Sequence, residues 1–134
     1  MREKSKWRIL LVEDDPGIGE PMEELLMFEG YEVVWVSSGR EALRKLDEDE
    51  LPHMILLDIM MPDMNGWEFR EKQLLHSERV ADIPVFVLSA DRRSEFRVDA
   101  TKREFFFPKP IDVENLANQM QLKLAEYYSG DSRF

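Results

Sequence analysis

The amino-acid sequence predicts a single doubly wound α/β domain, in which five helices cover the two faces of a five-stranded parallel sheet. Three observations support this fold class. Apolar, β-rich runs alternate five times with amphipathic stretches. Several of these runs are almost continuously apolar, as parallel strands are when both of their faces are covered. No internal linker or repeat interrupts the pattern, and 134 residues suit one domain with its own core.

The five apolar runs define the predicted strands. They lie at residues 8–12, 32–36, 54–57, 85–88 and 105–107. Because an amphipathic stretch separates each strand from the next, the connections are expected to be right-handed β-α-β crossovers. Such crossovers place the carboxyl ends of all five strands at one edge of the sheet.

The first two predicted helices carry recognisable end signals. Pro16 stands at a favoured first helical position and Gly30 at the helix exit. The apolar face of this first helix is formed by Ile18, Met22, Leu25 and Leu26. The second helix opens with Ser38 and Glu41 at capping-box spacing, and directs Ala42, Leu43 and Leu46 toward the sheet.

The three remaining helices differ in the strength of their patterns. The third is predicted at residues 67–76. The fifth begins at Asp112 and buries Leu116, Ala117, Met120 and Leu124. Between them, residues 92–104 are mostly charged, so that only Phe96, Val98 and Ala100 are available to anchor a fourth helix near residues 92–101. We expect this helix to be short and mobile.

Composition restricts the classes of function. The chain has no cysteine, which excludes disulfides and thiolate metal sites, and no apolar run approaches the roughly 20 residues that span a bilayer. A formal charge of −10 opposes direct binding to nucleic acid or anionic membranes. We expect a cytoplasmic domain at residues 8–128, preceded by an N-terminal extension (residues 1–7) and followed by a frayed tail (residues 129–134).

Reactive polar groups follow four of the predicted strands: Glu13-Asp14, Asp58, Ser89 and Lys109. At the carboxyl edge of a parallel sheet they would form a group of carboxylates with one hydroxyl and one ammonium. Carboxylates gathered around one point repel each other unless a cation neutralises them, and Mg²⁺ prefers such oxygen ligands. The pattern predicts a site for a divalent metal and a phosphoryl group.

Within this site, Asp58 is the candidate nucleophile. A carboxylate held in line with a metal-bound phosphoryl donor can form an acyl phosphate. Ser89 could donate a hydrogen bond to a phosphoryl oxygen, and Lys109, between two prolines, could pair with the carboxylate or the phosphate. Each motif taken alone has an ordinary structural explanation, such as Asp15 capping a helix at Pro16, so the prediction depends on the set.

The segments ILLVEDD (residues 9–15), LLDIMMPDMNG (56–66), VFVLSA (85–90) and FFFPKP (105–110) occur in the order and at the approximate separations of one known family. The chain resembles the receiver domain of two-component response regulators, from Arg8 to Tyr128. This resemblance implies a flavodoxin-like fold with strand order 2-1-3-4-5. It also implies a regulatory domain that catalyses only its own phosphorylation and dephosphorylation.

The resemblance assigns roles to individual residues. Asp58 would accept the phosphoryl group from a histidine kinase or phosphotransfer protein. Mg²⁺, or another divalent cation such as Mn²⁺, would be held by Asp14 and Asp58 directly, by Glu13 chiefly through water, and by the backbone carbonyl of Met60. Lys109 would pair with the phosphate. The resemblance also implies a conformational switch that is formed by Ser89 and Phe106 and signals to a protein partner.

Some positions depart from the common pattern of the family. The segment between Ser89 and Lys109 is shorter than usual, and Lys102-Arg103 replaces the small residues that commonly precede the fifth strand. The aromatic switch position holds phenylalanine rather than tyrosine, so no hydroxyl can report its inward state. Met60 and Asp91 occupy the two positions that tune phosphate lifetime in this family.

Two other functions share parts of this pattern. A receiver-like interaction module that works without phosphorylation would have the same fold, although the complete set of acids, serine and lysine argues against it. A magnesium-dependent phosphohydrolase of the haloacid-dehalogenase type would need a second acid two residues after the nucleophile, where this chain has Met60.

A basic cluster, Arg92, Arg93 and Arg97, contrasts with the acidic composition of the chain. It has two interpretations. It could be a solvated helix face with local ion pairs, or a docking surface for an acidic downstream protein.

Overall fold

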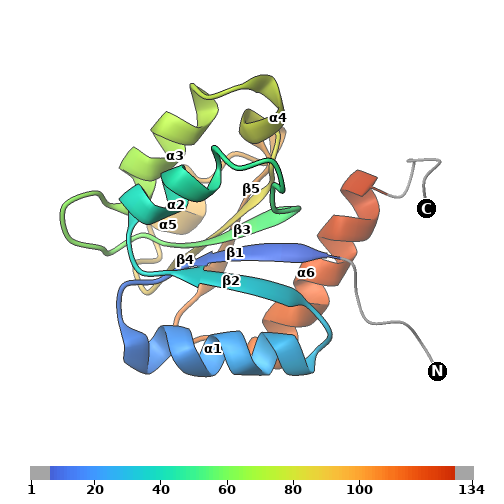
Figure 1. The fold of residues 1–134 in the computed structure, drawn as a ribbon. Helices are drawn as coiled ribbons and strands as arrows, with labels where there is room; N and C mark the ends of the chain where they lie inside the picture. The colour runs from blue at the N-terminus through green and yellow to red at the C-terminus, as the bar shows by residue number, and fades with distance from the viewer. Residues whose placement is uncertain (1–6, 129–134) are drawn as a thin grey trace.

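The structure, a computed structural model, describes residues 7–128. Its centre is a five-stranded parallel sheet with the order β2-β1-β3-β4-β5, which confirms the predicted fold class and strand order (Figure 1). The strands are β1 (Arg8–Val12), β2 (Glu32–Val36), β3 (Met54–Asp58), β4 (Val85–Ser89) and β5 (Glu104–Pro108). Each matches a predicted run, and three of them extend a residue further at one or both ends.

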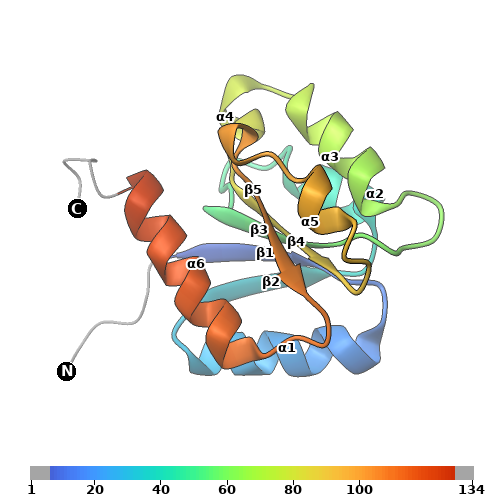
Figure 2. The same cartoon turned by 180° about the vertical axis from the view of Figure 1, so that it is seen from behind.

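Helices cover both faces of the sheet (Figures 1 and 2). They are α1 (Pro16–Phe28), α2 (Gly39–Lys45), α3 (Gly66–Leu74), α4 (Glu78–Ala81), α5 (Ser94–Arg97) and α6 (Val113–Tyr128), with a 3₁₀ turn, η1 (Ala100–Lys102). The prediction of five helices is therefore wrong in number, because it missed α4. A helix of four residues, capped by the Ser77 side chain, is too short to show a helical apolar period.

The alternation of side chains along the strands creates two cores. On β1, Ile9 and Leu11 face the cluster covered by α1 and α6, which contains Met22, Leu26, Leu116 and Met120. The neighbouring residues Leu10 and Val12 face the other cluster, which α2, α3 and α4 cover with Ala42, Leu46, Phe69 and Val80. Successive strand residues point to opposite faces, so apolar residues must be continuous along β1, as they are in the sequence.

The ends of α1 follow from its sequence. Asp15 accepts a hydrogen bond from the Gly17 N–H at the start. At the end, Gly30 has φ 104°, and the N–H groups of Gly30 and Tyr31 bond back to the carbonyls of Met27 and Leu26. This left-handed turn is the conformation that glycine adopts without steric cost.

The predicted apolar face of α1 is only partly correct. Met22 and Leu26 are buried, but Leu25 is 50% exposed. Instead, Gly19 lies against β2, where an added Cβ would stand 2.5 Å from the ring of Trp35. The helix therefore packs through a glycine position, and this rotates Leu25 toward the surface.

The fourth predicted helix is confirmed as short, but its predicted anchor is wrong. Helix α5 ends at Arg97, Val98 is extended, and the chain resumes as the 3₁₀ turn η1. Phe96 is 86% exposed and anchors nothing, whereas the polar residue Ser94 is buried. Val98 alone of the three expected anchors packs against a core cluster. Four helical residues are too few for an apolar stripe to form.

In the part of the chain that the structure describes, no helix is both long and apolar enough to cross a membrane. The predicted extension at residues 1–7, apart from Trp7, and the predicted tail at residues 129–134 lie outside the described residues. The domain boundaries remain a prediction.

Candidate metal and phosphoryl site

Three carboxylates meet at the carboxyl edge of the sheet. Val12 of β1 lies opposite Leu57 of β3 in the register, so Glu13 and Asp14 emerge beside Asp58. One carboxylate oxygen from each of these acids lies within 4.8 Å of the others. Glu13 and Asp58 are buried and Asp14 is half-buried. The arrangement offers a hard cation three oxygen donors.

Lys109 supplies a positive charge to this group. Its Nζ donates a hydrogen bond of 2.8 Å to Asp58 Oδ1 and lies 3.7 Å from Glu13 Oε1. Burial lowers the pKa of Lys109, but the hydrogen bond and charge of Asp58 and the charge of Glu13 outweigh burial, so its pKa is raised overall. The side chain is therefore a permanent cation in the neutral pH range.

Glu13 is the least satisfied of the acids. Burial, followed by the charge of Asp58, raises the pKa of Glu13 to about 7. Its Oε2 accepts a hydrogen bond from the Asp15 N–H, whereas its buried Oε1 has no hydrogen-bond partner. A buried carboxylate oxygen that accepts no hydrogen bond is costly even with the Lys109 ammonium 3.7 Å away, and a bound cation would reduce that cost. The residues present therefore fit a divalent metal.

Strand β2 fixes the backbone of Glu13. The Glu13 N–H bonds to the Val36 carbonyl at 3.1 Å, and the Trp35 indole Nε1–H donates to the Glu13 carbonyl at 2.8 Å. These bonds hold the acidic segment in place after β1 has ended. Sequence reasoning missed Trp35. Its only signal was a large indole in a strand otherwise rich in valine.

The loop after β3 wraps closely around Asp58. The Met60 N–H donates to Asp58 Oδ1 at 3.3 Å, and the Met60 side chain is largely exposed. The loop closes with a hydrogen bond from the Gly66 N–H to the Ile59 carbonyl. A Cβ at Gly66 would stand 2.8 Å from the Asp58 carbonyl oxygen, so only glycine allows α3 to begin this near to the acceptor.

Ser89 ends β4 on the side of β3 away from β1, and it is buried. Its carbonyl accepts a hydrogen bond from the Lys109 N–H at 3.0 Å, which ties the ends of β4 and β5 together. Phe106, on β5, is half-buried, and the Arg92 guanidinium lies 5.8 Å from its ring centroid. Ser89 and Lys109 are thus held at adjacent strand ends, and the Lys109–Pro110 bond between β5 and α6 is cis.

The basic cluster Arg92, Arg93 and Arg97 lies on the surface around α5. Arg93 pairs with Asp91 at 2.8 Å and Arg92 with Glu95 at 3.5 Å. The Arg97 guanidinium lies 4.2 Å from the Trp67 ring centroid on α3. All three arginines are exposed, so their charges remain accessible although each has a local partner.

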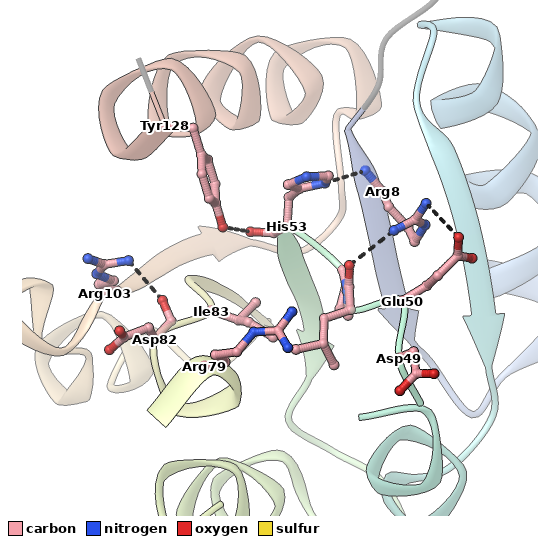
Figure 3. A pocket seen from close by; sticks show the side chains of 11 residues that line it. Arg8, Asp49, Glu50, His53, Arg79, Asp82, Ile83, Arg103 and Tyr128 are labelled. Atoms are coloured by element: carbon pink, nitrogen blue, oxygen red, sulfur yellow. Dashed lines mark hydrogen bonds and ion pairs between the residues drawn. The ribbon is translucent and has the colours of Figure 1, made fainter. Parts of the chain in front are cut away.

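A separate cavity of about 640 Å³ lies at the opposite edge of the sheet, where the strands begin (Figure 3). None of the predicted site residues lines it. Two of its arginines are already engaged: Arg8 donates to the Leu51 carbonyl and Arg103 to the Asp82 carbonyl. His53, at the same edge, accepts from the Arg8 N–H.

Comparison with known proteins agrees with this geometry. The family model described as the response regulator receiver domain matches residues 9–121. The response regulator MprA of Mycolicibacterium vanbaalenii is 35% identical over 120 residues, which cover 87% of this chain and 50% of that protein. The CpxR homolog of Haemophilus influenzae, a transcriptional regulatory protein, is 40% identical over 111 residues, covering 81% and 46%. The chain spans about half the length of these curated relatives.

Solved structures show the same fold. A CheY-like receiver domain protein from Methanospirillum hungatei superposes with a TM-score of 0.79 at 29% identity, covering 94% of this chain and 99% of that one. The response regulator TrrA from Thermotoga maritima, solved in complex with Mg²⁺-BeF, gives a TM-score of 0.74 at 28% identity, covering 88% and 98%. The chain therefore belongs to the receiver domain family of two-component response regulators.

Proposed function

We propose that this domain accepts a phosphoryl group on Asp58, with Mg²⁺ or Mn²⁺, from a histidine kinase or a histidine phosphotransfer protein. The observation that carries this proposal is the meeting of Glu13, Asp14 and Asp58 with Lys109 at one edge of the sheet. The Mg²⁺-BeF complex of the similar Thermotoga protein supports it.

The residues have distinct parts in the transfer. A carboxylate oxygen of Asp58 forms a bond to phosphorus, the bond from phosphorus to the donor imidazole nitrogen breaks, and its electron pair stays on that nitrogen. Asp14 and Asp58, with Glu13 and the Met60 carbonyl, would hold the metal, which neutralises charge on the phosphoryl oxygens. Lys109, now 2.8 Å from Asp58 Oδ1, would pair with the transferred group.

Phosphorylation would be reported by Ser89 and Phe106. The phosphoryl group adds negative charge and acceptor oxygens, to which the buried Ser89 hydroxyl can donate. Phe106 is half-buried, so an inward turn of its ring would remove further apolar surface from water. Movement of these two side chains would alter the surface around α5 and β5, where a downstream protein could bind.

Loss of the phosphoryl adduct in Asp58→Asn tests this function. The wild-type chain, incubated with magnesium and acetyl phosphate, is expected to gain the mass of one phosphoryl group, and chelation of the metal should prevent it. Asp63→Asn, an exposed aspartate in the same loop, is the matched control and should react like wild type.

Two results would contradict the proposal. An adduct that still forms in Asp58→Asn would show that another residue accepts the phosphoryl group. A wild-type chain that never forms the adduct, although it is folded and binds magnesium, would favour the receiver-like module that works without phosphorylation.

We further propose that Arg92, Arg93 and Arg97 contact an acidic downstream protein. Replacing all three with glutamate should weaken binding of the downstream target by at least about tenfold, because close like charges across an interface cost several kcal/mol. Adduct formation on Asp58 should stay at the wild-type rate. Reversal of Lys72 and Arg79, which are exposed on α3 and α4, serves as the control. If the variant with all three arginines replaced binds the target as wild type does, this surface is not the docking site.

The cytoplasmic location expected from the sequence stays a prediction.

A further inference from the structure

Helix α5 has few contacts that fix its position. It consists of four residues, and its N-cap residue, Arg93, makes no side-chain capping bond. Phe96 is 86% exposed, while Ser94 is only 6% exposed. Ser94 is thus the one buried residue of α5, and its hydroxyl needs a hydrogen-bond partner inside the protein.

The Ser94 hydroxyl bonds to the predicted switch residue. Ser94 Oγ donates to Ser89 Oγ over 3.1 Å, and it has no other hydrogen-bond partner among residues 7–128. Ser89 Oγ also accepts from the Asp91 N–H at 3.0 Å. The proton of Ser89 itself has only a long contact, 3.5 Å, to the Asp91 carbonyl. Both acceptor positions of Ser89 are filled, and its donor is almost unused.

This pattern gives the Ser89 hydroxyl a defined resting orientation. A phosphoryl oxygen can only accept a hydrogen bond, so it would attract the weakly used proton of Ser89. If the Ser89 side chain rotates to donate this proton to the phosphoryl oxygen, its Oγ moves away from Ser94. The buried Ser94 hydroxyl then loses its hydrogen-bond acceptor. A buried hydroxyl does not stay unpaired without cost, so Ser94 must move or meet water.

Movement of Ser94 would alter the contacts that the arginines at the two ends of α5 make with α3 and β5. The Arg97 side chain at its end stacks over Trp67 of α3, 4.2 Å from the ring centroid. Arg92, just before the helix, approaches Phe106 of β5. A cavity of about 530 Å³, lined by Ser89, Ser94 and Trp67 among others, leaves space beside these groups.

Building on the proposed phosphorylation of Asp58, we propose that Ser94 is a positioning residue that holds the Ser89 hydroxyl in its resting orientation and transmits its movement to α5. Ser94 does not touch the phosphoryl group. It acts through Ser89, and it makes the short helix the element that responds to the state of the site.

Beryllofluoride with magnesium, a mimic of the phosphoryl group, tests this role in the full chain. Ser94→Ala removes the resting bond, so half-saturation should occur at a beryllofluoride concentration about two- to tenfold lower than in wild type. Ser94→Thr keeps the hydroxyl and should titrate like wild type. Ser77→Ala, which removes a capping hydroxyl of α4 at the opposite edge of the sheet, is the matched control and should also leave the titration unchanged.

The indole N–H resonance of Trp67 gives a second readout that a general loss of stability would not move. The chain has three tryptophans, so Trp67→Phe assigns the signal. Without beryllofluoride, Ser94→Ala should shift this resonance toward its position in saturated wild-type protein, whereas Ser94→Thr and Ser77→Ala should not.

The outcomes separate this inference from the proposed function. Wild-type protein that binds no beryllofluoride at Asp58 overturns both. Wild-type protein that binds it, with a Ser94→Ala titration and Trp67 resonance equal to wild type, overturns only the role of Ser94. A higher half-saturating concentration in Ser94→Ala would also overturn it, because the hydroxyl would then support the phosphoryl-bound state.

Discussion

Replacing Arg70 with methionine is expected to lower the free energy of unfolding by about 3–5 kcal/mol, because it leaves a buried carboxylate without its cation. Arg70 of α3 is 2% exposed and its partner Glu104, at the start of β5, is 7% exposed. The Arg70 Nε lies 2.9 Å from Glu104 Oε2, and Nη2 donates to the Lys102 carbonyl. The other carboxylate oxygen of Glu104 accepts from the Asp99 N–H.

The loss is to be measured by chemical denaturation, with two comparisons. The double variant Arg70→Met with Glu104→Gln removes both charges and should recover much of the stability, since the cost comes from the unpaired carboxylate. Arg79→Met, at an exposed arginine on α4, should change stability by less than about 0.5 kcal/mol. A fall of under 1 kcal/mol in Arg70→Met would show that the pair is not the tie between α3 and β5 that its geometry indicates.

Metal-free protein is expected to lose stability through Glu13 as the pH rises from 5 to 8. The pKa of Glu13 is raised from 4.5 to about 7 by burial and by Asp58. A carboxyl group with a higher pKa in the folded state binds its proton more tightly when folded. Its contribution is fully present below pH 4.5 and is lost as the pH rises through about 7. The difference approaches about 3 kcal/mol.

Glu13→Gln isolates this contribution from that of the other acids. In the presence of a chelator, the unfolding free energy of the variant minus that of wild type should increase by about 2–3 kcal/mol between pH 5 and pH 8. Glu20→Gln, an exposed glutamate on α1, is the control and should show no such trend.

Magnesium should reverse the effect at high pH. Added at pH 8, it should stabilise wild-type protein more than Glu13→Gln, because the ionised carboxylate is then available to the ion. At pH 5 the gain should be smaller, since protons compete with the metal. A difference between wild type and variant that stays constant with pH would mean that Glu13 does not titrate in this range.

Much of the fold could be predicted because its signals are local. Strand β1 is apolar at every position from Ile9 to Val12, which a strand with two covered faces requires, and the alternation of strands and helices then leaves few topologies. The proximity of Glu13, Asp14 and Asp58 follows from the same topology, since parallel strands end at one edge.

Other features could not be predicted because they depend on residues that are distant in the sequence. Nothing near Arg70 announces a partner 34 positions later, and a charged residue on a helix is usually solvated. Phe96 is expected to be buried because its side chain is large and apolar, but α5 is too short to turn it inward. The contact of Ser94 with Ser89 arises from the path of a loop that carries no periodic signal.

The sequence by itself determined the strands of a parallel sheet and which acids meet at its edge, because hydrophobic periodicity and parallel topology place strand ends without reference to individual contacts. The order of the strands was implied by the resemblance to a known family. Only the tertiary structure decided which polar groups are paired inside. It selected Trp35 to hold Glu13, Arg70 to neutralise Glu104 and Ser94 to hold Ser89. Such pairs form where burial removes water, and burial is a property of the packed whole.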